Sequence, residues 1–321
     1  MSHLAHRRFA IAVFAGLCAF AAAPALAQMP PDIAARIAAL GRVVDATATA
    51  AIYAPLQESE PYAGIKVARD VKYGPSDRNV LDVFSAEGFA AAGPSDARPV
   101  LMFMHGGRYT RGDKRRPGSP FYDNIMLFAA RHGMVGVNLE YRLAPKDPWP
   151  AAVEDLAAAV RFVAGNVNTY GGNPGRIFLM GHSAGATHVA TYVAHKEFHG
   201  PNGSGLAGAM LSSGIYDLSK AEPTEERVAY FGADSSRYAE RSALPGLIDS
   251  NVPFMISSAE LDPPAMVEQF NLLREAMCKS ERGCIRAVAL PHHSHMSESY
   301  SINTADTLLS NQILEFIEKR R

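Results

Sequence analysis

The sequence predicts an open, doubly wound α/β fold built around a mostly parallel sheet of eight strands. Short apolar runs alternate along the chain with segments of helical rhythm, an alternation that is typical of this fold class. From the third run onward few polar residues interrupt the strands, as expected where helices cover both faces of a sheet. The 321 residues are 48% hydrophobic, so the chain is also long enough to bury one large core.

The first 27 residues have the pattern of a secretory signal. Basic residues at 6–8 precede an apolar run over 9–23, and positions 25–27 read Ala-Leu-Ala, the small-x-small pattern of a signal-peptidase site. The apolar run is shorter than the roughly 20 residues that a membrane-spanning helix needs. We therefore expect cleavage after Ala27 and an exported protein, periplasmic or secreted, with no stable membrane anchor after that cleavage.

The remaining chain is mildly acidic. Losing Arg7 and Arg8 with the leader reduces the 31 Lys and Arg residues to 29, against 32 Asp and Glu, which gives a formal charge of −3. This balance predicts no nucleic-acid partner and no affinity for anionic membranes. The one basic cluster, Arg111–Arg116, is interpreted as a solvated loop.

Residues 28–62 precede the sheet, and within them the apolar rhythm over 31–55 predicts one N-terminal helix. The α/β domain then occupies 63–321. Its expected strands are Ile65–Val71, Val80–Phe84, Val100–Met104, Met134–Leu139, Ile177–Met180, Leu206–Leu211, Val252–Ser257 and Ile285–Leu290. Its expected helices are Phe121–Arg131, Ala151–Asn166, Ala184–His195, Ala265–Lys279 and Ala305–Glu318.

Two segments depart from the strand–helix alternation. The first two strands are joined by a turn-forming stretch at 73–77, which predicts a hairpin at one edge of the sheet. Residues 214–251 follow the sixth strand and contain Pro223, Gly232 and Pro245. We interpret this stretch as a small, cap-like insert and not as a second domain.

The segment Gly181-His182-Ser183-Ala184-Gly185 directly follows a buried strand and opens a helix. This is the G-x-S-x-G nucleophile elbow of the α/β-hydrolase fold in the context that supports it. The turn is too tight for side chains two residues before and after the serine, so the Ser183 hydroxyl projects over the edge of the sheet. Ser183 is therefore the expected nucleophile.

A second glycine turn lies about eighty residues upstream. There a buried strand ends in His105-Gly106-Gly107-Arg108, and such glycines let backbone N–H groups turn toward a developing oxyanion. With the N–H of Ala184 they predict an oxyanion hole.

A serine nucleophile needs an imidazole base and a carboxylate that orients it, and in this fold both follow the serine along the chain. Asp262, after the seventh strand, is the expected acid, and Glu260 is its alternative. His295, after the eighth strand, is the expected base, and His293 is its alternative. His105 and His182 precede the acid, so we expect them to support the loops.

Cys278 and Cys284 remain after the leader is removed, and in an exported protein we expect them to form a disulfide. No cysteine or histidine spacing predicts a metal site, and the expected chemistry requires no cofactor.

With these residues in place, the chain resembles carboxylesterases related to hormone-sensitive lipase, and the neighbouring feruloyl-esterase-like and formamidase-like branches. The resemblance runs from about Val71 to the C-terminus. Its most specific stretches are the Glu-Tyr-Arg-Leu-Ala-Pro segment at 140–145, the segment 148–155, the turn at 170–174 and the elbow at 181–185. It implies that Tyr141, Arg142 and Pro145 buttress the oxyanion loop.

Two positions depart from the branch related to hormone-sensitive lipase. Arg108 stands where that family has a third loop glycine, and His182 stands where it often has an acid. His182 and the His-Ser-His ending at 293–295 are closer to the feruloyl-esterase-like and formamidase-like branches.

The expected activity is therefore hydrolysis of small carboxylic esters through an acyl-enzyme. An arylformamidase, another amidase or a lactonase on the same triad is the alternative, and a non-catalytic recognition module is the remote one. The short insert predicts a preference for short acyl chains, near C2 to C6. Arg108, and with it Arg111, could add a preference for substrates that carry a carboxylate.

Overall fold

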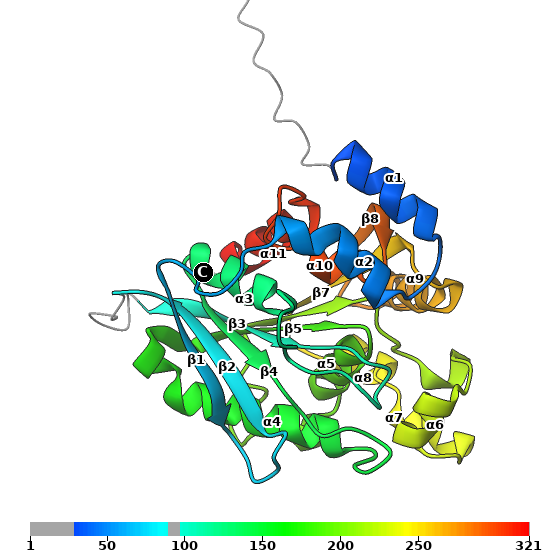
Figure 1. Ribbon diagram of the computed structural model, residues 1–321. Coiled ribbons are helices and arrows are strands. Elements are labelled where there is room, and N and C mark those ends of the chain that lie inside the picture. Colours follow the sequence, from blue (N-terminus) through cyan, green and yellow to red (C-terminus); the bar gives the residue numbers. More distant parts are fainter. Residues whose placement is uncertain (1–28, 89–96, 321) are drawn as a thin grey trace, which may run out of the picture.

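The computed structural model describes residues 29–88 and 97–320, so the expected signal segment 1–27 lies outside the described residues. An eight-stranded sheet forms the centre of the molecule, in the order β1-β2-β4-β3-β5-β6-β7-β8 (Figure 1). The strands are β1 Ile65–Lys72, β2 Val80–Ala86, β3 Arg98–Met104, β4 Val135–Leu139, β5 Gly172–His182, β6 Gly208–Ser212, β7 Phe254–Leu261 and β8 Arg286–Ser294. All eight expected strands are present, within a few residues at their ends.

The sheet is antiparallel at one edge and parallel elsewhere. β1 and β2 form the expected edge hairpin, β2 pairs antiparallel with β4, and the pairs from β4 through β3 to β8 are parallel. Because the chain crosses back after β4, β3 lies beside β5, with Met104 opposite Gly181. The loop after β3 and the turn after β5 therefore leave the same edge of the sheet side by side.

Helices cover both faces of the sheet, which explains the uninterrupted apolar runs of the central strands. They are α3 Asp123–Arg131, α4 Ala151–Asn166, α5 Ala184–Ala194, α8 Leu244–Asp249, α9 Pro264–Lys279 and α11 Leu308–Glu318. Along β3, Val100 and Met102 enter the core that contains α4, α5, α8 and α9 residues. Leu101 and Phe103 enter the opposite core, against α3 and α11.

The N-terminal segment forms two helices, so the prediction of one helix over 31–55 is wrong. α1 spans Pro31–Leu40 and α2 spans Ala46–Tyr53. Gly41, with φ 74°, ends α1, because glycine adopts a positive φ at little cost. Asp45 begins α2, since its side chain accepts a hydrogen bond from the Ala48 N–H at 2.8 Å.

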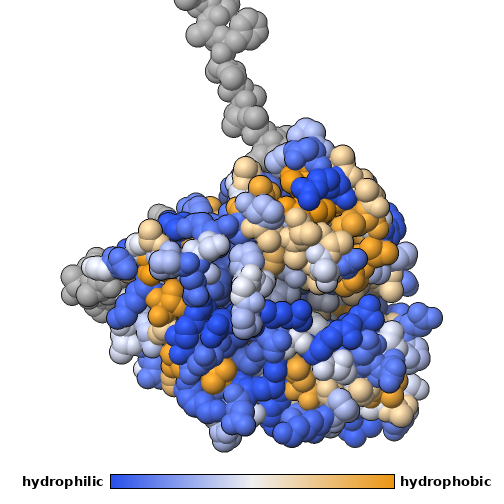
Figure 2. Space-filling model, in the orientation of Figure 1, coloured by the Kyte–Doolittle hydropathy of each residue, from blue (hydrophilic) through white to orange (hydrophobic). Residues whose placement is uncertain are grey.

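Both helices pack near the carboxyl ends of the last strands, beside β8 and the short helix α10 (Ser297–Tyr300) (Figure 1). Ile37 and Tyr53 are buried in a third apolar cluster that also contains Phe121 and Met296. Apolar surface gathers over this part of the molecule, at the upper right of Figure 2. The N-terminal segment is thereby fixed above the edge of the sheet where the candidate catalytic residues lie.

The segment 214–251 contains only short helices: α6 Glu225–Phe231, α7 Tyr238–Arg241, α8, and two 3₁₀ turns at Leu218–Lys220 and Ser235–Arg237. Its aromatic side chains turn inward. Tyr230 stacks on Tyr109 with ring centroids 5.4 Å apart, and Phe231 lies 5.6 Å from Trp149. The segment is thus joined to the oxyanion loop and to the turn before α4.

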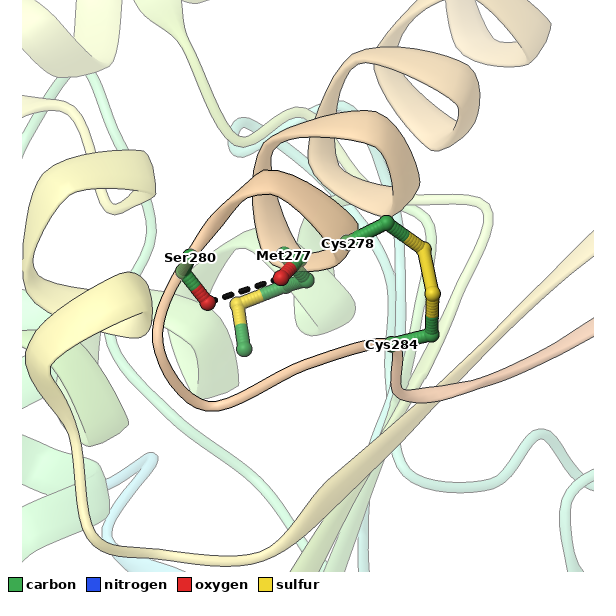
Figure 3. Close-up of a disulfide and its surroundings, with 4 residues drawn as sticks. All are labelled: Met277, Cys278, Ser280 and Cys284. Carbon is green, nitrogen blue, oxygen red and sulfur yellow. Dashed lines mark hydrogen bonds between the residues drawn. A yellow bond between two sulfur atoms is a disulfide. The ribbon is translucent and has the colours of Figure 1, made fainter.

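The expected disulfide joins Cys278, near the end of α9, to Cys284, before β8 (Figure 3). It closes the tight turn between these elements, where the Ser280 hydroxyl also donates to the carbonyl oxygen of Met277 at 2.7 Å. Within residues 29–88 and 97–320, no helix is long and apolar enough to cross a membrane.

Candidate active site

Ser183 stands between β5 and α5 with φ 58° and ψ −125°. The turn is so tight that both flanking glycines are required. A Cβ on Gly181 would lie 2.5 Å from the carbonyl oxygen of Gly185, and a Cβ on Gly185 would lie 2.1 Å from that of Met104. The Ser183 N–H donates to the carbonyl oxygen of Ser212 at 2.9 Å, which ties the turn to β6. This is the geometry of a nucleophile elbow.

Asp262 directly follows β7 and His295 directly follows β8. Because β5 to β8 are parallel neighbours, both residues lie at the edge where Ser183 stands. His295 Nδ1 is 2.8 Å from Asp262 Oδ1, and the two side chains are 1% and 0% exposed. This pairing leaves Nε2 as the ring nitrogen that can accept a proton.

The second oxygen of Asp262 has three donors. Asp262 Oδ2 accepts from Ser213 Oγ at 2.5 Å, from Ser258 Oγ at 2.9 Å and from the Ala259 N–H at 2.9 Å. Burial acts to raise the pKa of Asp262, but the hydrogen bond and charge of His295, with the two serine hydroxyls, hold that pKa below its ordinary value. Asp262 is therefore ionised at neutral pH and can stabilise an imidazolium.

The glycines of the oxyanion loop contact the elbow directly. A Cβ on Gly106 would lie 2.8 Å from Ser183 Cβ, so only glycine fits against the serine. Gly107 has φ 138°, and a Cβ there would lie 1.7 Å from the carbonyl oxygen of Arg111. Gly106 and Gly107 line one cavity with Ser183, and Ala184 lines a second cavity with it.

A buried network braces this loop. The Tyr141 hydroxyl donates to the carbonyl oxygen of His105 at 2.8 Å, as expected from the resemblance, and His105 Nε2 lies 2.9 Å from Glu140 Oε1. Glu140 also accepts from the Lys114 N–H at 2.9 Å and pairs with Arg78. Sequence reasoning did not identify Glu140 as functional, although it begins the Glu-Tyr-Arg motif.

The His182 side chain supports the candidate base by a hydrogen bond to the backbone of His295. Its Nε2 donates to the carbonyl oxygen of His295 at 2.8 Å, and the two rings lie 4.6 Å apart. Burial, and then the charge of His295, lower the pKa of His182 to about 3. The ring is therefore neutral and orients the loop without competing for the proton.

Neither alternative residue is paired with a candidate triad member. His293 is buried, with Nδ1 3.0 Å from Ser297 Oγ and Nε2 3.1 Å from Asp306 Oδ2. Glu260 is exposed, and its carboxylate accepts the His292 N–H at 2.7 Å. The structure thus gives each of them a separate partner.

Sequence reasoning also missed two residues beside Asp262. Ser213 has φ 52° and follows β6, but no local motif distinguishes it from other serines. Glu298, in α10, is completely buried. Burial, and then the negative charge of Asp262, raise the pKa of Glu298 well above its ordinary value. Glu298 therefore keeps its proton to a higher pH than an ordinary glutamic acid, and Asp262 is the more readily ionised of the two.

Two cavities meet at the candidate nucleophile, with volumes of about 430 and 230 Å³. Of the described residues, four line both: Ser183, His295, Val44 and Arg108. Val44 comes from the linker between α1 and α2, and Arg108 from the oxyanion loop. An ester bound with its carbonyl at Ser183 can therefore extend in two directions.

Within residues 29–88 and 97–320, no three histidine, cysteine or acidic side chains are grouped so that they could hold a metal ion.

Comparison with known proteins gives a consistent picture. The BD-FAE family model matches residues 88–205. Esterase LipQ of Mycobacterium tuberculosis is 27% identical over 270 residues, which are 77% of this chain and 60% of LipQ. The isoprenylcysteine alpha-carbonyl methylesterase ICME of Arabidopsis thaliana is 30% identical over 163 residues, 48% of this chain and 36% of that protein. The chain thus spans at most about 60% of the length of these two relatives.

Among solved structures, a bacterial heroin esterase superposes with a TM-score of 0.64 at 22% identity, covering 92% of this chain and 98% of that one. At this identity the likeness concerns the fold. Together, the sheet order, the family-model match and these relatives show that the chain is an α/β-hydrolase-fold protein that resembles carboxylesterases.

Proposed function

We propose that this protein is a serine hydrolase that cleaves carboxylic esters, with Ser183 as nucleophile, His295 as general base and Asp262 as its orienting acid. One observation carries the proposal. His295, which is paired with the buried Asp262, lines both cavities, and Ser183 on its nucleophile elbow lines the same two. The carboxylesterase names of the sequence relatives support an ester as substrate.

The reaction proceeds by acyl transfer in two steps. Ser183 attacks the ester carbonyl while His295 Nε2 takes its proton, and the ionised Asp262 stabilises the imidazolium. His295 then protonates the departing alcohol, and a water molecule, activated in the same way, hydrolyses the acyl-enzyme.

Backbone N–H groups of Gly106, Gly107 and Ala184 stabilise the oxyanion in this mechanism. Loss of one such donor typically costs about 10²–10³ in rate. The bracing of the loop by Tyr141 and Glu140 keeps these groups in place before substrate binds, so the transition state is stabilised without reorganisation of the site.

The decisive test compares the wild-type protein with Ser183→Ala on 4-nitrophenyl butyrate. The variant should lose turnover to near background, while its thermal unfolding temperature stays within about 2 °C, because alanine preserves the turn and an isolated hydroxyl contributes little packing. Activity at a tenth of wild type or more would refute the nucleophile. A parallel panel of aryl formamides, anilides and lactones measures whether esters are the preferred class.

We also propose that the protein is exported after cleavage behind Ala27. The disulfide supports this proposal, because such bonds persist in oxidising compartments. Mass analysis of the protein recovered from the producing cell should give a chain that begins at Gln28. A cytosolic chain that retains residues 1–27 would refute it.

A further inference from the structure

The larger cavity has two walls of different chemistry. One wall is apolar and aromatic: Phe121 and Tyr300 stack with centroids 3.8 Å apart and an interplanar angle of 15°, and Tyr122 and Met296 continue the surface. Val44, Ala46 and Ala50 add small apolar side chains from the N-terminal segment. Such a wall fits a flat apolar group.

The other wall is cationic. Arg108, Arg111 and Arg116 line the cavity together with Asp113, so these side chains carry a formal charge of +2. Arg108 pairs with Glu226 at 3.2 Å. The carboxylates nearest Arg111 and Arg116 lie at 3.9 and 3.8 Å, which is beyond hydrogen-bond distance.

Arg116 lines the same cavity as the aromatic wall. Burial raises the pKa of Tyr300, and the positive charge of Arg116 opposes that rise. The same charge acts on Tyr122. Because the rings and the arginines line one cavity, a flat group against the rings can present a terminal anion to the cationic wall.

The smaller cavity has a different charge balance. Ala184, Ile215 and Met266 supply apolar surface, while Glu222 and Glu226 balance Arg108 and Arg227, for a formal charge of zero. A short neutral acyl group fits this side. The two halves of an ester thus meet different surroundings on either side of Ser183.

We propose that the larger cavity is a binding site for an alcohol part that combines an aromatic ring with a carboxylate, recognised by Arg111 and Arg116, while a short acyl group occupies the smaller cavity. This inference rests on the ester hydrolysis proposed above. It keeps Arg111 from the sequence expectation and replaces Arg108, which is paired with Glu226, by Arg116 further along the same loop.

The test compares 4-acetoxybenzoate with 4-acetoxybenzamide, which differ only in the charged group. The wild type should hydrolyse the benzoate with a kcat/KM about tenfold higher, a modest factor because the Arg111 and Arg116 side chains are more than half exposed to solvent. A carboxamide activates a phenol leaving group more than a carboxylate does, so intrinsic reactivity opposes this preference. Added salt at about 1 M should abolish it, since the Debye length falls to about 3 Å.

The double variant Arg111→Ala, Arg116→Ala should lose the preference, with its kcat/KM for the benzoate no higher than its kcat/KM for the benzamide. Its side-chain changes leave intact the backbone hydrogen bond from the Arg111 N–H to Gly107. Arg237→Ala, which removes an exposed arginine that lines neither cavity, is the matched control and should keep the preference.

Equal kcat/KM values for the two esters in the wild type, or an undiminished preference in the double variant, would overturn this inference and leave ester hydrolysis standing. If the protein cleaves none of the three substrates (the benzoate, the benzamide and 4-nitrophenyl butyrate), the proposed function itself is overturned. Calorimetric titration with 4-hydroxybenzoate and 4-hydroxybenzamide then tests the site alone: tighter, salt-sensitive binding of the benzoate that the double variant loses supports it, and equal binding refutes it.

Discussion

Ser183 has a positive φ in a region of backbone space that serine rarely adopts, at a typical cost of about 1–3 kcal/mol. Two hydrogen bonds offset this strain: the Ser183 N–H donates to Ser212, and the Ser183 carbonyl oxygen accepts from the Thr187 N–H at 3.2 Å. The glycine contacts on either side leave the turn no room to relax. At the scale of single residues, reactivity therefore depends on a conformation that the surrounding backbone imposes.

The two buried histidines of the last loop allow the proposed base to be tested against its alternative. His295→Ala should reduce kcat on a short ester as much as Ser183→Ala does, because triad members act as a unit. His293→Ala should retain most of the kcat of the folded protein but destabilise it by about 1–3 kcal/mol, since it removes the imidazole that lies 3.1 Å from the buried Asp306 carboxylate. Steady-state kinetics and urea unfolding on both variants check this. A larger kcat loss at His293 than at His295 would reverse the assignment of the base.

At the scale of elements, the linker 41–45 connects the N-terminal helices to the site. Val44 lines both cavities, and Arg42 donates to the backbone carbonyl oxygen of Asp262 at 3.1 Å. The linker therefore lies over the point where the two halves of a substrate diverge. Its neighbour Val43 is 49% exposed and lines neither cavity.

This arrangement predicts that Val44 limits acyl length. In the wild type, kcat/KM for 4-nitrophenyl esters should peak near C2 to C6. Val44→Ala should move the peak to longer chains, with a gain of about fourfold for each additional methylene that becomes buried, which is about 0.8 kcal/mol each. Val43→Ala is the matched control and should leave the profile unchanged. A wild-type kcat/KM that rises steadily to C12 would show that the smaller cavity is not the acyl site.

At the scale of the whole molecule, the features that could be predicted from the sequence are those that a local residue pattern determines. The strands were identified because both faces of the central sheet are covered, and Ser183 because glycines on both sides reveal the elbow. The break between α1 and α2 was missed although Gly41 and Asp45 signal it, since the apolar rhythm continues across them. The pairing of Glu140 with Arg78 and the contact of Ser213 with Asp262 join residues 62 and 49 positions apart. No local pattern encodes contacts at such separations.

The stability of the whole molecule should also depend on buried neutral histidines. His188, in α5, is 1% exposed and lies among the rings of Tyr109, Tyr141 and Tyr230. Burial, and then the charge of His105, lower the pKa of His188 to about 3. The pKa of His182 is also lowered to about 3, by burial and then by the charge of His295.

A histidine with an ordinary pKa of about 6.5 binds a proton more readily in the unfolded chain than at these sites. Between about pH 6.5 and pH 3 the unfolded state therefore takes up more protons, and the free energy of unfolding falls as the pH is lowered. The stability that the neutral histidine rings contribute to the folded state is fully present above about pH 6.5 and is lost progressively toward pH 3. A tenfold difference in proton affinity between the folded and unfolded chains corresponds to about 1.4 kcal/mol, so His188 alone accounts for several kcal/mol.

Urea unfolding at intervals from pH 7.5 to pH 4.5 measures how steeply the free energy of unfolding changes with pH. In the lower part of that pH range, His188→Phe should reduce the slope of unfolding free energy against pH by the amount that corresponds to about one bound proton. Phenylalanine still places an aromatic ring in the site but does not titrate. His132→Phe is the control. His132, at the end of α3, also has a ring contact, to Phe128, but it is more than a third exposed, and its substitution should leave the slope unchanged. An unaltered slope in His188→Phe would show that the acid sensitivity has another source.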